Sequence, residues 1–448
     1  MKKLDIQHAV LACLTLWGLT CLVGKHLENV DMQTNYRPIF VAQQQGKNKK
    51  SSNKYQVQPS MKKILFYTPF FHMQDWEFGF GHEPFVNFQC PVSSCFTTNN
   101  KSQFGSILEF DAILFHIRDM HLSNDKPIMT QLPDIRGDHQ RYVFFLMESP
   151  SYDTFPHESF ANYFNWTMTY RRDSDFYRPY GWIAPKNWDW HYPKSALNNI
   201  SWSQYPRQSG LVKNFKHKLK RAAWLVSNCH TMSQREHYVQ ELAKHFPVDI
   251  YGHCPQILKS HGQCPDNSEC SDFIQDNYMF YLSFENSMCR DYVTEKFWNF
   301  LSGKLIPIVL GGADYKKVAP AKSYINVLDF ANPLELAQHL KYISTNVTAY
   351  SQYFEWVPHF NVFKNEPANF ARAMCQLCEA MHSPDLDQPM VYKDTQDWWV
   401  AQGQCSQDFP WIEKTYKYQW TKLTDWSKFL QDSASKALDS LRSSQVII

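Results

Sequence analysis

The sequence lacks an excess of charge of either sign. Its 448 residues include 45 Lys and Arg against 43 Asp and Glu, which gives a formal net charge of +2 at pH 7 with histidine neutral. A strongly basic surface is what draws a protein to nucleic acid or to an anionic membrane. The near balance excludes recruitment of this kind, and we expect no nucleic-acid partner.

Two glycine-rich nucleotide-binding motifs are also missing. The chain contains neither a Gly-x-Gly-x-x-Gly sequence nor a Walker loop. The first motif brings a dinucleotide pyrophosphate close to a helix start, and the second cradles the phosphates of a nucleoside triphosphate. Their absence argues against a dinucleotide oxidoreductase and against a P-loop enzyme.

No small-x-small cleavage site follows the apolar run at the amino end, Ala9–Gly24. A cleaved signal peptide and a signal anchor both fit so short a run, and the missing cleavage site favours the anchor. A lysine pair before the run favours a cytoplasmic amino terminus. We predict a cytoplasmic tail at 1–8, a single transmembrane anchor at 9–24 and a polar, flexible stem at 25–60, with the remainder lumenal.

The cysteines and the glycosylation sequons agree with a lumenal location. Of the 12 cysteines, two lie in the apolar run and ten lie beyond it. Close pairs of cysteines in such a compartment indicate disulfides, and the Cys-x-x-Cys sequence has no second pair that would complete a zinc site. The disulfide candidates, whose connectivity stays open, are Cys90, Cys95, Cys264, Cys270, Cys375 and Cys378. The four sequons are at Asn100, Asn165, Asn199 and Asn346.

Short apolar runs alternate with longer mixed segments from residue 61 onward. The candidate strands are Ile64–Phe70, Ala112–Ile117, Tyr142–Met147, Ala222–Val226, Val248–Tyr251, Tyr278–Phe284, Leu305–Leu310 and Tyr324–Val327, and the helical patterns include Gln234–Phe246 and Pro333–Phe354. Continuous apolar strands separated by helices indicate parallel sheets that are covered on both faces. We predict an α/β protein with two doubly wound, Rossmann-like domains that face each other across a cleft.

The domain limits follow from shifts in composition. A polar, basic segment near Tyr205–Lys220 is the candidate seam between the two domains. We therefore place a first Rossmann-like domain at 61–205, a second at 206–370 and a carboxyl-terminal tail at 371–448.

One stretch, FYLSFENSMCRDYVTEKFWNFLSGKLIPIVLGG, places charged residues directly after an apolar strand. Asp291 is a good N-cap, and from it Tyr292, Glu295 and Lys296 share one face of the expected helix. A helix start at the carboxyl end of a parallel sheet suits a phosphate, and a neighbouring carboxylate suits a ribose diol. The plainer interpretation is that the Glu-Lys pair only decorates a solvated helix start.

A second strand end favours the functional interpretation. Arg235 lies in AAWLVSNCHTMSQREHYVQEL, which again reads as a strand, a polar turn and a helix start. Asn286 ends the strand in the first stretch. Two basic groups, one from each strand end, suit a pyrophosphate better than an open surface.

These residues carry a resemblance to a known family. The strings FYLSFENSMCRDYVTEKFWN and IPIVLGG, together with WLVSNCHTMSQREHYVQEL, VDIYGHC, FFLMESPSYD and FNWTMTYRRDSDFYRPYG, resemble the α1,3/1,4-fucosyltransferases, glycosyltransferase family 10. The resemblance covers nearly all of residues 61–380. It implies a GT-B fold, GDP-β-L-fucose as the donor, inversion at the anomeric carbon, and a type II, single-pass Golgi membrane protein.

The resemblance also assigns roles to particular residues. It implies GDP-fucose contacts from Arg235, Asn286, Tyr292, Glu295 and Lys296, with Arg235 and Lys296 at the pyrophosphate and Glu295 at the ribose. The proposed general base falls on Glu148 in MESPSYD, at the end of a strand in the other domain. With two fixed cations we expect no tightly bound metal, although stimulation by Mn²⁺ or Mg²⁺ stays open. Asp173-Ser-Asp175 lies in the acceptor half and is interpreted as structural.

The resemblance implies that the acceptor is a glycan of a glycoprotein, and two classes of acceptor compete. His116, Arg118 and Asp119 partly resemble the acceptor segment of the Lewis-type enzymes, which modify antenna N-acetylglucosamine. The CPVSSC sequence and the aromatic tail look more like the core-type enzymes, which modify the innermost residue of N-glycans. We predict α1,3 transfer to the core residue, with antenna N-acetyllactosamine as the alternative. A lectin-like or inactive scaffold is the rival class, and the intact Glu148, Arg235, Glu295 and Lys296 argue against it.

Overall fold

The computed structural model describes residues 39–41, 60–121, 132–188, 200, 202, 215–259, 262, 264, 270–364, 367–383 and 391–406. The predicted anchor, almost all of the stem, the seam at 205–206, Asn199 and the tail after residue 406 lie outside these ranges. Among the helices within them, none combines the length and the apolar character that crossing a bilayer requires.

The first part of the chain forms a six-stranded sheet with the order β3-β2-β4-β6-β7-β8, and every neighbouring pair is parallel. Its strands are β2 (Lys62–Phe66), β3 (Cys95–Thr98), β4 (Ala112–His116), β6 (Arg141–Leu146), β7 (Trp166–Thr169) and β8 (Phe176–Tyr177). All residues of β4 and β6 are buried, as expected for strands that are covered on both faces. Short strands β1 (Ile39–Val41) and β5 (Ile135–Gly137) lie outside this sheet.

The second part forms a five-stranded parallel sheet with the order β11-β10-β12-β13-β14. Its strands are β10 (Leu219–Val226), β11 (Val248–Gly252), β12 (Tyr278–Phe284), β13 (Ile306–Leu310) and β14 (Ile325–Asn326). Along the chain the sheet grows from β10 to β11 on one side and from β10 to β12 on the other. The carboxyl ends of β10 and β12 therefore form a topological switch point, where open parallel sheets bind their ligands.

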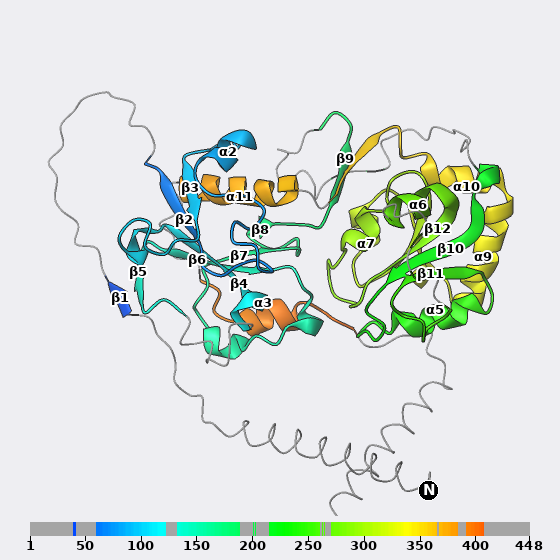
Figure 1. Ribbon diagram of the computed structural model, residues 1–448, viewed down its shortest axis with the longest axis horizontal. Coiled ribbons are helices and arrows are strands. Elements are labelled where there is room, and N and C mark those ends of the chain that lie inside the picture. Colours follow the sequence, from blue (N-terminus) through cyan, green and yellow to red (C-terminus); the bar gives the residue numbers. More distant parts are fainter. Residues whose placement is uncertain are drawn as a thin grey trace, which may run out of the picture. The chain divides into compact units, whose positions relative to one another are not determined.

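Helices and short turns connect these strands (Figure 1). The α-helices are α2 (Glu83–Asn87), α3 (Ile117–His121), α5 (Arg235–Ala243), α6 (Cys270–Asn277), α7 (Glu295–Trp298), α8 (Tyr315–Val318), α9 (Pro333–Thr345), α10 (Val347–Ser351) and α11 (Pro367–Met381). The 3₁₀ turns are η1 (Ile107–Glu109), η3 (Pro150–Tyr152), η4 (His157–Phe160), η6 (Phe215–His217), η8 (Val327–Asp329) and η9 (Gln352–Phe354), and η11 (Gln396–Ala401) is a π-helix.

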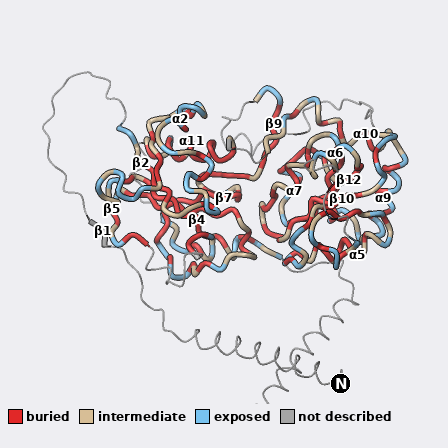
Figure 2. Tube along the Cα trace, in the orientation of Figure 1, coloured by how far each residue is buried: buried red, intermediate tan, exposed pale blue. Residues whose placement is uncertain are grey.

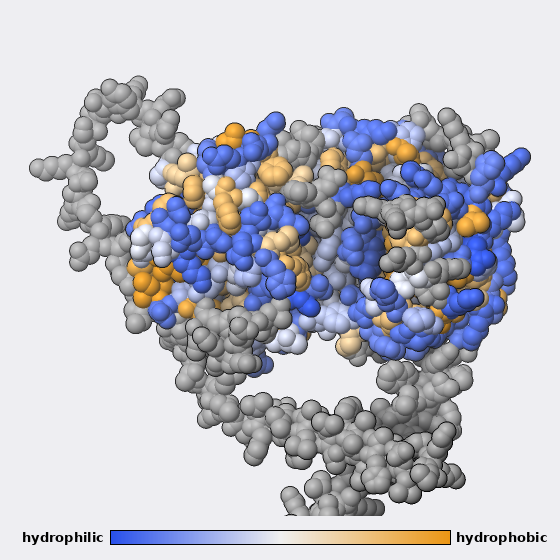
Figure 3. Space-filling view, in the orientation of Figure 1, coloured by the Kyte–Doolittle hydropathy of each residue, from blue (hydrophilic) through white to orange (hydrophobic). Residues whose placement is uncertain are grey.

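The second sheet is covered on both faces because its side chains alternate. On β10, Ala222 and Trp224 join the cluster that packs under α5 and α9, whereas Ala223 joins a separate cluster with Ile274 of α6. Figure 2 shows the strands of both sheets as mostly buried and the connecting segments as the more exposed parts. On the face drawn in Figure 3 most of the described surface is hydrophilic, and its apolar residues are scattered in small patches. The prediction of two parallel α/β sheets is confirmed.

The chain returns to the first sheet after completing the second. Strand β15 (Phe360–Phe363) pairs antiparallel with β9 (Trp182–Pro185), and α11 follows beside α2 (Figure 1). Phe370 of α11 packs against Trp76 and Phe145 of the first half. The segment from 367 onward, which the composition assigns largely to a tail, thus completes the core of the first sheet.

The disulfides explain this return. Cys90, in the turn between α2 and β3, is bonded to Cys375, and Cys95, which begins β3, is bonded to Cys378, so both bonds join α11 to the first half. All six disulfide candidates are bonded, which confirms them. Of the close pairs, only Cys264 and Cys270 bond each other, and the other four cysteines have distant partners. Sequence reasoning missed two further bonds, Cys229–Cys254 and Cys289–Cys405.

Candidate functional site

The segment after β12 does not form the expected long helix. Helix α7 contains only four residues and begins at Glu295. Asp291, the expected N-cap, has a φ of 60° and lies in a turn, and Tyr292 comes before the helix on irregular backbone. So short a helix has too few aligned peptide groups to supply the expected dipole. The predicted helix-start phosphate site is therefore corrected, and any role of this loop must come from its side chains.

The buried carboxylate of Glu285 connects the two ends of this loop. It directly follows β12 and its side chain is fully buried. One oxygen accepts from the Thr294 backbone N–H at 2.8 Å, and the other accepts from the Thr294 hydroxyl at 2.8 Å. Burial raises the pKa of Glu285, while the charge of Lys296 opposes that shift. Because Glu285 read only as the polar end of an apolar strand, sequence reasoning missed its role in holding the loop.

Lys296 connects Glu285 to the open side of the loop. Its ammonium lies 3.6 Å from the Glu285 carboxylate and 2.9 Å from that of Glu295, and it donates to the Thr294 hydroxyl at 2.8 Å. Burial alone would lower the pKa of Lys296, but the two carboxylates outweigh it and raise that pKa. The Glu295 side chain is 44% exposed. Burial would raise the pKa of Glu295, yet Lys296 and its hydrogen bonds lower it overall. Both groups are charged at neutral pH.

Arg235 lies at the switch point of the second sheet. It begins α5, and its guanidinium donates to the carbonyls of Phe284, which ends β12, and of Asn228, which follows β10. The side chain is 3% exposed, and burial lowers its pKa. Its Nε has no hydrogen-bond partner among the described residues. Arg235 therefore joins the two strand ends between which a ligand of this sheet would bind.

Asn286 and Tyr292 lie on the same loop as these groups. The Asn286 carbonyl accepts from the backbone N–H of Ser233 at 3.0 Å, which joins the loops after β10 and β12. The Tyr292 side chain is 2% exposed and is therefore not displayed on an open helix face as predicted. It packs against aromatic residues of the first half instead.

Glu148 of the first half reaches this aromatic group. It follows β6 directly and is half-buried. The rings of Tyr170 and Tyr180 lie 5.0 and 6.3 Å from that of Tyr292. Burial raises the pKa of all three hydroxyls, and the negative charge of Glu148 raises them further. Glu295 acts on Tyr180 in the same direction. The predicted base and the predicted ribose ligand thus act on one tyrosine, although they come from different sheets.

Hydrogen bonds hold the Glu148 segment against the second half. The hydroxyls of Ser149 and Ser287 are 2.6 Å apart, and both side chains are fully buried. On the other side of Glu148, the Met147 carbonyl accepts from the Tyr180 hydroxyl at 2.6 Å. The residues on both sides of Glu148 are therefore fixed, which limits where its carboxylate can lie.

The segment 391–406, which we call the strap, fastens the loop after β12. A disulfide joins Cys405 of the strap to Cys289 of the loop, and the backbone of Arg290 donates to the Gly403 carbonyl at 2.8 Å. On its other side, fully buried Trp399 packs 5.5 Å from the ring of Tyr170 in the first half. The safer sequence interpretation, that this aromatic tail packs, holds for the part of it that is described.

The predicted acceptor residues divide into a buried pair and an exposed cation. His116 Nδ1 and an Asp119 oxygen are 2.7 Å apart, and both side chains are nearly inaccessible. Burial is the largest influence on His116 and lowers its pKa, whereas its hydrogen bond with Asp119 opposes the shift. Arg118 is exposed. His116 and Asp119 are therefore too buried to contact a glycan directly in this structure. Of the three residues, Arg118 alone exposes its side chain to solvent.

The described sequons differ in accessibility. Asn100 is exposed, and Asn346 is half-buried at the start of α10. Asn165 is 7% exposed, and its amide oxygen accepts from the Tyr142 backbone at 2.8 Å and from the guanidinium of Arg136. A glycan on Asn165 would need the space that these partners occupy, so the burial of this side chain argues against its glycosylation in the folded chain.

Comparison with known proteins places the chain in a family. A family model described as "Fucosyltransferase, N-terminal" matches residues 59–181, and one described as "Glycosyltransferase family 10 (fucosyltransferase) C-term" matches residues 215–398. Alpha-(1,3)-fucosyltransferase C of Drosophila melanogaster is 34% identical over 356 residues, which cover 76% of this chain and 78% of the relative. The chain therefore belongs to glycosyltransferase family 10, the fucosyltransferases. The prediction of an α1,3-fucosyltransferase enzyme is confirmed.

Other relatives carry different names. Glycoprotein 3-alpha-L-fucosyltransferase A of D. melanogaster is 32% identical over 77% of this chain and 62% of its own length. The 3-galactosyl-N-acetylglucosaminide 4-alpha-L-fucosyltransferase FUT3 of Bos taurus is 35% identical over 64% of this chain and 70% of its own length. A crystal structure of an α1,3-fucosyltransferase with GDP-fucose aligns with 77% of this chain and 96% of its own, at 17% identity and a TM-score of 0.40.

Proposed function

We propose that the chain transfers L-fucose from GDP-β-L-fucose, with inversion, to O3 of the innermost N-acetylglucosamine of protein N-glycans. The observation that carries this proposal is that both neighbours of Glu148 are held at the second half: Ser149 bonds Ser287 of the loop after β12, and Met147 bonds Tyr180, whose ring lies 6.3 Å from that of Tyr292. Transfer of a sugar requires a base that acts on the acceptor and charged groups that bind the donor, and here the two sheets supply one each. We further infer that the two sheets form a GT-B arrangement, with the reaction in the cleft between them.

The donor would bind at the switch point of the second sheet. Lys296 and Arg235 supply positive charge there, and the leaving pyrophosphate gains negative charge as the bond from fucose C1 to oxygen breaks. Fixed cations stabilise that charge most strongly in the transition state. The partly exposed carboxylate of Glu295 would accept hydrogen bonds from the ribose hydroxyls. Asn286 and Tyr292 would fix the position of the loop against the nucleotide.

Glu148 would act on the acceptor. Its carboxylate takes the proton from the acceptor O3 hydroxyl as O3 bonds to fucose C1, while the electron pair of the broken bond leaves with GDP. Attack on the face opposite GDP converts the β-linked donor into an α-linked product. Because the two cations neutralise the leaving group, no tightly bound metal is needed, and Mn²⁺ or Mg²⁺ would act only as stimulants.

The core acceptor is preferred for two reasons. Among the relatives above, one is named a glycoprotein 3-α-L-fucosyltransferase. Trp399 of the strap also packs against Tyr170, whose ring contacts that of Tyr292, which supports a specialised role for the aromatic carboxyl-terminal segment. The alternative acceptor is antenna N-acetyllactosamine, which the name of the bovine relative favours.

The proposed compartment is the Golgi lumen, with a type II membrane topology. Five disulfides within the described residues are typical of a protein that folds in an oxidising compartment. The apolar run 9–24 would be the single membrane anchor. Protease added to sealed microsomes should then spare everything after residue 30, and digestion of the full-length product from outside would contradict the proposal.

A transfer assay separates the acceptors. The full chain in detergent would receive GDP-fucose with either an N-glycan core glycopeptide or N-acetyllactosamine. We expect fucose on the core glycopeptide, in a product that resists a peptide N-glycosidase blocked by core α1,3-fucose. Transfer to lactosamine alone would establish the alternative instead.

A further inference from the structure

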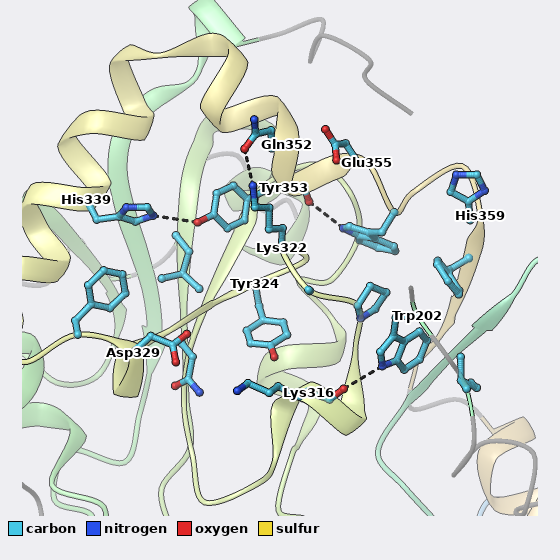
Figure 4. A pocket seen from close by; sticks show the side chains of 18 residues that line it. Trp202, Lys316, Lys322, Tyr324, Asp329, His339, Gln352, Tyr353, Glu355 and His359 are labelled. Atoms are coloured by element: carbon cyan, nitrogen blue, oxygen red, sulfur yellow. Dashed lines mark hydrogen bonds between the residues drawn. The ribbon is translucent and has the colours of Figure 1, made fainter. Parts of the chain in front are cut away.

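A large cavity lies at the edge of the second sheet, away from the loop after β12. Its volume is about 980 Å³, and it is lined by β14, by the loop before β14, by α9 and by the segment 352–360 (Figure 4). Pockets that hold small ligands have volumes of roughly 300–1,000 Å³. Because β14 is two strands from β12, about 10 Å separates the two regions across the sheet.

The walls of this edge cavity include aromatic rings that the protein holds in place. The Trp356 indole N–H donates to the Tyr353 carbonyl at 2.9 Å, and the Tyr353 hydroxyl lies 3.0 Å from His339 Nε2. Tyr324 projects toward the middle of the cavity (Figure 4). Since the polar groups of Trp356 and Tyr353 already have partners, these rings offer their apolar surfaces at little further cost in side-chain entropy.

Two polar groups of the cavity are available to a ligand. Within the described part of the chain, neither the Tyr324 hydroxyl nor the Asp329 carboxylate has a hydrogen-bond partner, and Asp329 is exposed. Asp329 is close enough to raise the pKa of both Tyr324 and Tyr353, in each case after the larger effect of burial. The Lys322 ammonium, by contrast, already donates a hydrogen bond to the Gln352 side-chain oxygen at 2.7 Å.

The charges around the cavity balance. Lys316 and Lys322 oppose Asp329 and Glu355, and burial lowers the pKa of His339, which keeps that imidazole neutral at pH 7. A balanced site gives no net attraction to a nucleoside diphosphate or to another anion. Ring faces beside a carboxylate and a hydroxyl suit a neutral ligand that has apolar C–H faces and many hydroxyls.

We propose that the edge cavity binds a neutral oligosaccharide, as a glycan site separate from the reaction site. Ring faces would pack against the C–H faces of the sugar, and Asp329 and Tyr324 would bind neighbouring hydroxyls. The choice of a glycan as the occupant rests on the proposed function, because an enzyme that modifies glycoproteins meets such ligands at high local concentration. A second site would raise the affinity for extended acceptors by keeping them nearby.

Calorimetry with small saccharides tests the proposal. The full chain, in a detergent without a sugar headgroup, would be titrated with α3,α6-mannotriose and with chitotriose, once with saturating GDP and once without it. We expect at least one to bind, and Asp329→Asn and Tyr324→Phe each to weaken that binding at least fivefold. The matched control is Asp276→Asn, because the exposed side chain of Asp276 pairs with Lys304 and does not line the cavity. It should leave binding unchanged, and all variants should melt within about 2 °C of the parent.

Three results would overturn the proposal. These are the failure of both saccharides to bind, binding that Asp329→Asn leaves intact, and binding that GDP abolishes, which would assign the cavity to the donor. Fucose transfer measured on the same preparation tests the proposed function separately. Saccharide binding without transfer would sink the proposed function but not the cavity, and transfer without saccharide binding would do the reverse.

Discussion

Replacing Lys296 by methionine should cost stability as well as donor binding. Lys296 lies 3.6 Å from the Glu285 carboxylate, which is fully buried, whereas the lysine side chain is 22% exposed. Methionine keeps most of the apolar stem and removes the charge. The substitution leaves Glu285 without the ion pair that it forms with Lys296.

The size of the effect follows from the geometry. At 3.6 Å and an effective dielectric constant of about 20, the attraction is roughly 4–5 kcal/mol. Removing one member of a buried pair typically costs 3–5 kcal/mol. Because Thr294 still donates two hydrogen bonds to Glu285, we expect a smaller loss of about 2–3 kcal/mol in the free energy of unfolding. With Lys296 absent the pKa of folded Glu285 rises further, so the folded state binds the proton more tightly. The deficit should therefore shrink as the pH falls.

Thermal melting of the full chain at pH 7.5 and 5.5 checks this reasoning. We expect Lys296→Met to melt about 3–5 °C lower at pH 7.5 and to recover part of that loss at pH 5.5. The double variant Lys296→Met/Glu285→Gln should regain most of the stability while donor affinity stays at least tenfold weaker, since a charge-assisted contact is worth roughly 1.5–3 kcal/mol. A single variant as stable as the parent at pH 7.5 would refute the account of Glu285.

Three further predictions concern other parts of the molecule. Replacing Cys289 and Cys405 together by serine should raise the KM for GDP-fucose more than fivefold, because it releases the strap from the loop after β12. The control, Cys264→Ser/Cys270→Ser, should keep its KM within twofold of the parent. Equal KM values in the two variants would contradict the positioning role of the strap. Burial lowers the pKa of His116, so the unfolded state gains its proton first and stability falls as the pH drops below 6.5. His116→Asn should reduce the slope of the unfolding free energy against pH in that range by up to ~1.4 kcal/mol per pH unit. An unchanged slope would show that His116 does not cause the pH dependence. Asn346→Gln should lower the mass of the secretory-pathway product by one glycan, whereas Asn165→Gln should leave it unchanged; a mass loss at Asn165 would show that this sequon is modified before folding.

Strands were the part of the fold that could be read most directly from the sequence. Tyr278–Phe284 is β12 without a change of boundary, because a continuous apolar run ends in a charged residue there. The edge strands β8 and β9 were missed, since short strands carry too few residues for a periodic signal. Helix α7 was overestimated because burial of Phe297 and Leu301 fits a helical stripe and also fits a turn packed into the core.

The sequence was sufficient to select several residues of the candidate site but not to predict how they are arranged. Arg235 and Lys296 follow strand ends, which a parallel sheet brings to one edge, so local patterns were sufficient to select them. Their partners were not readable, because the Lys296–Glu285 contact depends on the path of an irregular loop. Gly312 shows the same limit: a Cβ there would lie 2.5 Å from the Met288 backbone, a close approach that no local pattern indicates. Pairing of Cys289 with Cys405, 116 residues apart, likewise depends on the completed fold.

The central claim is that Glu148 is the base that acts on the acceptor while the second half holds the donor. Glu148→Gln keeps the shape of the side chain and removes its basicity. Titration with GDP and a single-turnover transfer assay on the same preparation measure the two functions separately. The account predicts GDP affinity within twofold of the parent and transfer slower by ~10²–10⁴, the range that general-base catalysis supplies. Transfer at a near-parental rate would contradict it, because the proton would then go to another group.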